Sequence, residues 1–241
     1  MRICKKILAL DFDRTIADTF TSSPSGLGVN EAYAVAVESV FGKHGLNSYK
    51  HLGGLRNRSP REVVSELQQS GFLACENATA LTNKLVGHKI DCLTNQIGQA
   101  LPDGTLWPRL TEGFADFWRQ VVANSSVFTA ILSSGHRAFI IRTFQVHELA
   151  LPDFIITDDE LRILPEPLSK PDPRLWGYLL QESHITPLDS LYIGDDQVKD
   201  GGLARNAGVP FLHFAPEGAP DFALGGSFAD WRDVIPLFVK A

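Results

Sequence analysis

Cysteine, positive charge and long apolar runs are all scarce in this sequence, and each scarcity argues against a class of protein. The three cysteines among 241 residues are Cys4, Cys75 and Cys92, and no two of them have the close spacing of a zinc or redox motif. A disulfide framework is therefore not expected. Lysine and arginine number 22 against 28 acidic residues, which gives a formal net charge of −6. Non-specific binding to nucleic acid needs a basic face, so no nucleic-acid partner is expected.

The apolar residues are spread in short runs. No run approaches the roughly 20 residues that span a bilayer, so no membrane partner is expected. The basic residues near the start of the sequence are followed by only a few apolar ones, whereas a secretory signal needs a longer apolar stretch and a cleavage site. We therefore expect a cytoplasmic protein. A composition that is 44% hydrophobic and 21% charged is ordinary for a globular fold.

Short apolar runs that end in polar residues alternate with helical patterns through much of the chain. Buried strands are predicted at residues 7–10, 128–132, 154–157, 191–193 and 210–214. Helical periodicity is found at residues 112–123, 137–149, 172–180, 198–207 and 230–239. This alternation predicts an α/β fold with a parallel sheet covered by helices on both faces. Ligands of such sheets bind beyond the carboxyl ends of the strands.

About a hundred residues with no strand signal separate the first two strands, which is too long for an ordinary loop. Amphipathic helical patterns fill this stretch at residues 29–43, 60–70 and 76–99. We therefore predict a core domain formed by residues 1–17 and 110–241. Residues 18–109 are predicted to form an inserted helical domain.

Two carboxylates follow the first predicted strand, in the sequence Asp11-Phe12-Asp13-Arg14-Thr15. A carboxylate at a strand end can attack phosphorus, and a second one in the same turn can protonate the leaving oxygen. Two carboxylates so close together repel each other unless a divalent cation lies nearby. The pattern alone fits a capping turn equally well, because Asp and Thr are common turn and cap residues.

A candidate phosphate site follows the second strand. Ser133, together with the backbone N–H groups of Ser134 and Gly135 at a helix start, could cradle a phosphate. Lys170, in Ser-Lys-Pro-Asp-Pro, supplies the positive charge that phosphoryl transfer requires.

Acidic residues follow a further strand, in Gly-Asp-Asp-Gln-Val-Lys-Asp at residues 194–200. Asp195 would complete a cation site with Asp11 and the backbone carbonyl of Asp13. Asp200, or with less weight Asp196, would be a further carboxylate near the metal and its waters. Together the strand ends favour the chemical interpretation over the capping turn.

With four motifs in this order, the chain resembles the haloacid dehalogenase-like (HAD) hydrolase superfamily. The inserted helices are similar to the cap of its phosphoglycolate phosphatase and β-phosphoglucomutase branch. The resemblance implies a Rossmann-like core and Mg²⁺ bound by Asp11, Asp13 and Asp195. It implies that Asp11 is the nucleophile, that Asp13 is the general acid/base, and that Ser133 and Lys170 bind the phosphoryl group. Lys170 would also orient Asp11, and Thr15 would brace the first loop.

Arg14 departs from the family, which usually has glycine at that position. Glycine tolerates backbone angles that other residues avoid. The arginine either points to solvent or reaches a second anionic group of the substrate. In the inserted domain, Arg56 or Arg58 could bind a carboxylate or a second phosphate of the substrate, or could belong to a solvated turn.

The carboxylate of Asp13 favours phosphate esters as substrates. In the superfamily that the chain resembles, dehalogenases and phosphonatases lack a carboxylate at this position. The expected function is therefore a Mg²⁺-dependent phosphatase for a small phosphorylated metabolite, a sugar phosphate or phospho-acid, with an aspartyl-phosphate intermediate. A phosphomutase is the alternative, because it would use the same residues. A non-catalytic scaffold with this fold is a distant third. The sequence leaves open whether the protein is a monomer or a homodimer.

Overall fold

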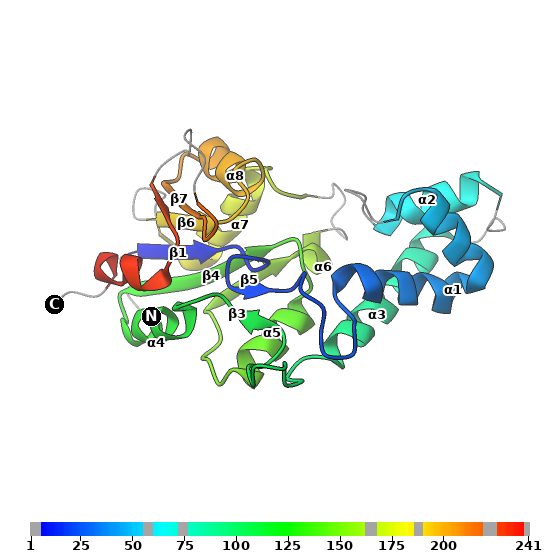
Figure 1. Ribbon diagram of the computed structural model, residues 1–241. Helices are drawn as coiled ribbons and strands as arrows, with labels where there is room; N and C mark the ends of the chain where they lie inside the picture. Colours follow the sequence, from blue (N-terminus) through cyan, green and yellow to red (C-terminus); the bar gives the residue numbers. More distant parts are fainter. Residues whose placement is uncertain are drawn as a thin grey trace. The chain divides into compact units, whose positions relative to one another are not determined.

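The computed structural model describes residues 6–54, 60–71, 77–161, 168–185, 190–218 and 226–238. The chain forms two compact units, shown in Figure 1. One unit contains Met1–Asp18 and Pro108–Ala241, and the other contains Thr19–Trp107. None of the helices in the described ranges combines the length and the apolar character that crossing a bilayer requires.

The first unit is built on a six-stranded sheet with the strand order β5-β4-β1-β6-β7-β8. Neighbouring strands are parallel throughout, which confirms the predicted parallel sheet. The strands are β1 (Lys6–Leu10), β4 (Val127–Ser133), β5 (Phe154–Thr157), β6 (Ser190–Gly194), β7 (Phe211–Phe214) and β8 (Ser227–Phe228). The first five match the predicted apolar runs closely. The last was not predicted, because two residues carry too little pattern to be recognised.

Helices lie on both faces of this sheet, as predicted, with α4 and α5 on one face and α7 and α8 on the other (Figure 1). They span α4 (Phe114–Ala123), α5 (Arg137–Val146), α7 (Arg174–Ser183) and α8 (Asp200–Ala207), and a short α6 (Asp158–Leu161) follows β5. Each strand of such a sheet contributes alternate side chains to the two faces.

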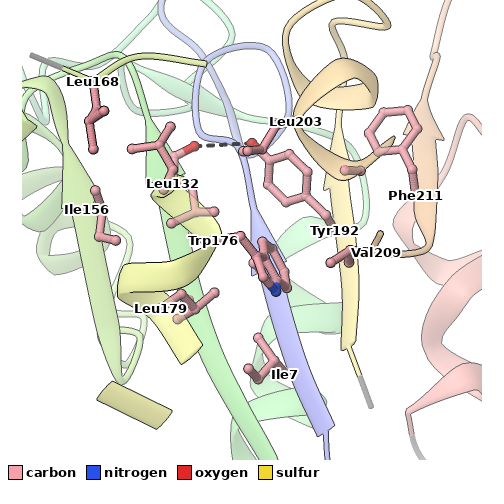
Figure 2. Close-up of a cluster of buried hydrophobic side chains, with 14 of the residues drawn as sticks. Ile7, Leu132, Ile156, Leu168, Trp176, Leu179, Tyr192, Leu203, Val209 and Phe211 are labelled. Atoms are coloured by element: carbon pink, nitrogen blue, oxygen red, sulfur yellow. Dashed lines mark hydrogen bonds between the residues drawn. The ribbon is translucent and has the colours of Figure 1, made fainter. Parts of the chain in front are cut away.

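The face under α7 and α8 is a continuous apolar core. Figure 2 shows side chains of α7 and α8 packed against alternate residues of the strands. From the helices come Trp176, Leu179 and Leu203, and from the sheet come Ile7, Leu132, Ile156, Tyr192 and Phe211. Burying a large apolar side chain contributes about 1.5–3 kcal/mol, so this layer is a principal source of the stability of the unit.

The opposite face is strongly aromatic. The rings of Phe114, Trp118 and Phe144 lie with centroids 5.4–6.3 Å apart, and Trp231 contacts Phe114 at 5.2 Å. Polar indole groups are satisfied as well: Trp118 Nε1 donates to the carbonyl of Ala150 at 2.7 Å. Trp231 belongs to η2 (Trp231–Leu237), which is a 3₁₀ helix and not the α-helix predicted at residues 230–239. A proline within it lacks the N–H that a regular helix would use.

A two-stranded antiparallel ladder, β2 (Ala17–Asp18) with β3 (Arg109–Leu110), joins the two chain segments of the first unit. Next to it, Thr111 Oγ1 donates to the carbonyl of Thr15 at 2.7 Å. These contacts tie the loop after β1 to the segment that leads into α4, on either side of the inserted unit in sequence.

The second unit is helical in its described part and contains α1 (Val29–His51), α2 (Pro60–Gln69) and α3 (Ala78–Thr94). It has its own apolar cluster, in which Tyr33 stacks on Tyr49 with ring centroids 5.7 Å apart. Helix α1 extends beyond the predicted 29–43. The chain kinks at Gly42 (φ 69°, ψ −177°) and then continues as a second helical segment that ends at His51. Glycine adopts that backbone conformation at low energetic cost, whereas other residues do not.

Candidate functional site

The order of the strands determines where a ligand of this sheet would bind. From the central β1, the chain places β4 and β5 on one side and β6, β7 and β8 on the other. The strand order therefore reverses at β1, and the carboxyl ends of strands at such a reversal form the usual binding crevice of an open α/β sheet. Asp11 follows β1, Ser133 ends β4, and Asp195 follows β6. Their residue types were recognised in sequence, and the sheet gathers them at one edge.

Lys170 lies between two buried carboxylates. Its Nζ donates to Asp11 Oδ1 at 2.5 Å and to Asp200 Oδ1 at 2.7 Å. The three side chains are 6%, 7% and 1% exposed, respectively. Burial opposes the ammonium charge, but the charges of Asp11 and Asp200 outweigh it and hold the pKa of Lys170 well above its ordinary value. Lys170 is thus a buried cation with one N–H directed at Asp11.

The acidic groups outnumber this ammonium. Burial raises the pKa of Asp11 well above its ordinary value, and Asp200 and Asp13 raise it further against the opposing effect of Lys170. Burial and Asp200 also raise the pKa of Asp195 to about 6. Both shifts have one cause, an excess of negative charge in a place with little water. A bound cation would relieve that excess.

The donor atoms in this cluster fit a hard divalent cation. Among the described residues, Asp11, Asp195 and Asp200 each offer a carboxylate oxygen within 4.8 Å of the other two. Carboxylate oxygens are the ligands that Mg²⁺ prefers in proteins. The three are not equally available, however. The Asp200 oxygens already accept hydrogen bonds from Lys170 at 2.7 Å and from the backbone N–H of Asp196 at 3.1 Å.

Thr15 links the two carboxylates that are more available. Its Oγ1 lies 3.3 Å from Asp195 Oδ1 and 3.5 Å from Asp11 Oδ2. One hydroxyl proton can serve only one of these acceptors at a time, and both distances are long, so both oxygens keep lone pairs for a cation. Thr15 is fully buried and holds the first loop against the strand ends.

Asp13 lies beside the loop after β4. A Cβ atom placed on Gly135 would lie 3.3 Å from Asp13 Oδ2 and 3.2 Å from Ser133 Oγ. Gly135 therefore permits a close approach between the first loop and the second. Its backbone N–H donates to Ser133 Oγ at 2.9 Å. The structure thus brings Asp13, Ser133 and Gly135 together, with Ser133 buried and Ser134 exposed.

The remaining predicted residues have other surroundings. Asp196 Oδ1 accepts hydrogen bonds from the backbone N–H groups of Val198 and Lys199, both at 2.9 Å, so this carboxylate shapes the turn that leads into α8. Arg14 is exposed and has φ 61°, in the left-handed region that favours glycine. Arg56 and Arg58 lie outside the described residues.

Two residues at the site had no recognisable signal in the sequence. Tyr192 OH lies 2.9 Å from Asp200 Oδ1 and 3.3 Å from Lys170 Nζ. On β7, His213 Nε2 donates to the backbone carbonyl of Asp195 at 2.8 Å. Each belongs to an apolar strand run, where an aromatic residue is expected for packing alone. Only the folded structure shows what their polar atoms contact.

Comparison with known proteins agrees with this architecture. Residues 8–214 match the family model described as haloacid dehalogenase-like hydrolase. No curated protein matches the chain.

Solved structures with the same fold cover nearly the whole chain at low sequence identity. CbbY from Rhodobacter sphaeroides, solved in complex with phosphate, is 15% identical with a TM-score of 0.59, over 95% of this chain and 96% of that one. The HAD-hydrolase YfnB from Bacillus subtilis, bound to magnesium, is 13% identical with a TM-score of 0.55, over 97% and 98%. A 2-haloacid dehalogenase from Pseudomonas syringae is 14% identical with a TM-score of 0.59, over 97% of each chain.

Proposed function

Because the chain belongs to the haloacid dehalogenase-like hydrolase family, we propose that it is a Mg²⁺-dependent phosphatase acting on a small phosphorylated metabolite. The nucleophile in this proposal is Asp11. The observation that carries the choice of phosphatase is the carboxylate of Asp13 beside Ser133 and Gly135. Hydrolysis of a phosphate ester expels an alkoxide, which must be protonated, and a second carboxylate next to the nucleophile can supply that proton.

The fold alone does not distinguish among the reactions of this family. CbbY, which was solved with phosphate, and a 2-haloacid dehalogenase match this chain with the same TM-score. The choice therefore rests on the residues at the strand ends. Phosphate and magnesium, present in the CbbY and YfnB structures respectively, are ligands of the kinds that we propose here.

In the first half of the proposed reaction, a carboxylate oxygen of Asp11 attacks phosphorus. The bond between phosphorus and the ester oxygen breaks, and Asp13 gives its proton to that oxygen. The product alcohol leaves, and the phosphoryl group remains on Asp11. Ser133 and the backbone N–H groups of Ser134 and Gly135 would bind the phosphoryl oxygens. The ammonium of Lys170, 2.5 Å from Asp11, orients the nucleophile and opposes the rise in its pKa that burial causes.

In the second half, Asp13 accepts a proton from water, and the water oxygen attacks phosphorus. The bond between phosphorus and the Asp11 oxygen breaks, which releases inorganic phosphate, restores the Asp11 carboxylate and leaves Asp13 protonated for the next turnover. A divalent cation would be held by Asp11, Asp195 and the backbone carbonyl of Asp13. When bound, it would offset the negative charge that the phosphate brings to this acidic site.

Release of phosphate from a panel of phosphate monoesters, with Mg²⁺ and with a chelator, tests the proposal. We expect turnover that requires Mg²⁺ and that falls by at least about 10³-fold in Asp11→Asn, because an amide oxygen is a far weaker nucleophile. Asp116→Asn is the matched control, because it makes the same chemical change on α4, at a side chain that is 69% exposed.

Other reactions of this fold appear as distinct outcomes of the same experiment. Halide release from 2-haloacids would indicate a dehalogenase. An isomerised sugar phosphate without free phosphate would indicate a phosphomutase, which uses the same residues but protects its phosphoryl-enzyme from water. No turnover by a folded protein that binds Mg²⁺ would overturn the phosphatase proposal and favour a scaffold.

A further inference from the structure

Tyr192 is a buried tyrosine whose hydroxyl lies among the charged groups of the candidate site. It stands on β6, opposite Ala9 of β1 and Phe211 of β7, and its side chain is fully buried. The ring packs in the apolar layer under α7 and α8, with Trp176 at 6.0 Å and Phe211 at 6.2 Å between ring centroids. Packing accounts for the ring but not for the hydroxyl, since phenylalanine would fill nearly the same volume.

The hydroxyl has three polar neighbours. It lies 2.9 Å from Asp200 Oδ1, 3.3 Å from Lys170 Nζ and 3.3 Å from the carbonyl oxygen of Leu132, the last drawn as a dashed line in Figure 2. A phenol has one proton to donate. The carboxylate is charged and is closer than the carbonyl, so the proton goes to Asp200. The oxygen then accepts from Lys170.

The Lys170 ammonium has three N–H groups, and each has an acceptor here. They are Asp11 Oδ1, Asp200 Oδ1 and Tyr192 OH. With all three directions occupied, the ammonium cannot rotate about its last bond without losing a hydrogen bond. Tyr192 also holds the Asp200 oxygen that Lys170 contacts, so its hydroxyl braces both members of that ion pair.

We propose that Tyr192 is a positioning residue, whose hydroxyl fixes Lys170 and Asp200 so that Lys170 keeps one N–H directed at the nucleophile Asp11. This role rests on the phosphatase activity proposed above. Tyr192 itself does not touch the substrate. Its contribution is to the orientation of the group that holds the nucleophile, and orientation of this kind affects the chemical step more than it affects substrate binding.

The test is Tyr192→Phe, which removes the hydroxyl and leaves the ring in place. We expect kcat to fall roughly 10- to 100-fold, the equivalent of losing one hydrogen bond to a charged group, while KM changes less than about twofold. Tyr178→Phe is the matched control. It makes the same chemical change away from the site, at an α7 residue that is 40% exposed. It should keep the kinetic constants of the wild type.

A second variant separates positioning from general support of the fold. In an Asp200→Asn background the charged acceptor is gone, so adding Tyr192→Phe should lower kcat much less than it does in the wild type. A merely structural role predicts a lower midpoint of urea unfolding with kcat unchanged for the folded enzyme, and that result would overturn the proposal. Equal effects of Tyr192→Phe in both backgrounds would overturn it as well.

The wild-type enzyme, assayed in parallel, distinguishes the two proposals. Turnover by the wild type together with unchanged turnover by Tyr192→Phe overturns the positioning role and leaves the phosphatase intact. Absence of turnover by the wild type overturns the phosphatase, and the positioning role with it.

Discussion

Replacing Lys170 with methionine tests the charge arrangement of the site without requiring knowledge of the substrate. Methionine has a similar volume but no charge, so the change removes the ammonium and its hydrogen bonds to Asp11 and Asp200. A hydrogen bond to a charged group contributes about 1.5–3 kcal/mol, and breaking a buried ion pair from one side costs about 3–5 kcal/mol. Water screens little here, because all three side chains are at most 7% exposed.

The stranded carboxylates can take up a proton, which limits the cost, so we expect the free energy of unfolding to fall by about 3 kcal/mol at pH 7. Urea unfolding followed by tryptophan fluorescence measures it, because three of the four tryptophans, Trp118, Trp176 and Trp231, lie in the unit that holds the site. Lys199→Met is the matched control. Lys199 is exposed and its side chain caps no helix, so that variant should stay within about 0.5 kcal/mol of the wild type.

A second substitution identifies the cause of the loss. In Lys170→Met/Asp200→Asn, one of the two stranded charges is removed as well, so the double variant should be more stable than the sum of the single changes predicts. We expect a coupling of at least about 1.5 kcal/mol between the two sites. If Lys170→Met costs no more than Lys199→Met, or if the two changes simply add, the buried ion pair does not stabilise the fold in the way described here.

The end of β6 and the short helix α6 give two further predictions. A Cβ atom on Gly194 would lie 2.3 Å from Asp200 Oδ2, so Gly194→Ala should displace that carboxylate and cost about 1–3 kcal/mol in urea unfolding; a wild-type midpoint would contradict this. Burial alone would raise the pKa of Glu160, but hydrogen bonds from Thr157 and Arg137 outweigh it and lower the pKa. Above the unfolded pKa of about 4.3, Glu160→Gln should therefore be less stable than the wild type, and this gap should close as the pH falls through the lower folded pKa. Because the Glu160 side chain is 40% exposed, water screens its charge, and we expect a gap of only about 0.5 kcal/mol. A gap that is independent of pH would show that the charge of Glu160 is not responsible.

Arg14, the one departure noted in the first motif, has a left-handed backbone conformation in the structure. The sequence shows an arginine where the family usually has glycine, and the structure shows that this residue takes φ 61°. A left-handed backbone costs an ordinary residue roughly 1–2 kcal/mol, which glycine would not pay. The backbone N–H of Arg14 donates to the carbonyl of Ala17 at 2.8 Å. This hydrogen bond closes the loop and offsets part of that cost. The arginine charge also lowers the pKa of Asp195, though less than burial and Asp200 raise it.

The sequence alone determined the fold class and the central strands of the sheet. The apolar runs of β1, β4, β5, β6 and β7 are unambiguous, because a strand buried on both faces needs continuous hydrophobic residues. The polar residues at the ends of those strands were visible for the same reason, since they interrupt the apolar pattern abruptly. Elements of two residues, such as β8, have no such pattern, and the helical periodicity at 230–239 could not distinguish an α-helix from the 3₁₀ helix that forms.

Tertiary structure alone decided how the polar atoms are partnered. Asp196 and Asp200 are four residues apart in one motif, yet Asp196 holds backbone N–H groups of a turn while Asp200 is buried against Lys170. Tyr192 and His213 lie in apolar strand runs typical of a core, and only the folded structure shows that the start of α8 places Asp200 beside the Tyr192 hydroxyl and that the end of β6 places Asp195 beside the His213 imidazole. Hydrophobic burial follows a periodicity that a single chain segment displays. A hydrogen bond between polar atoms of different elements depends on how the fold places and orients both elements. The sequence pattern of either element alone does not show that arrangement.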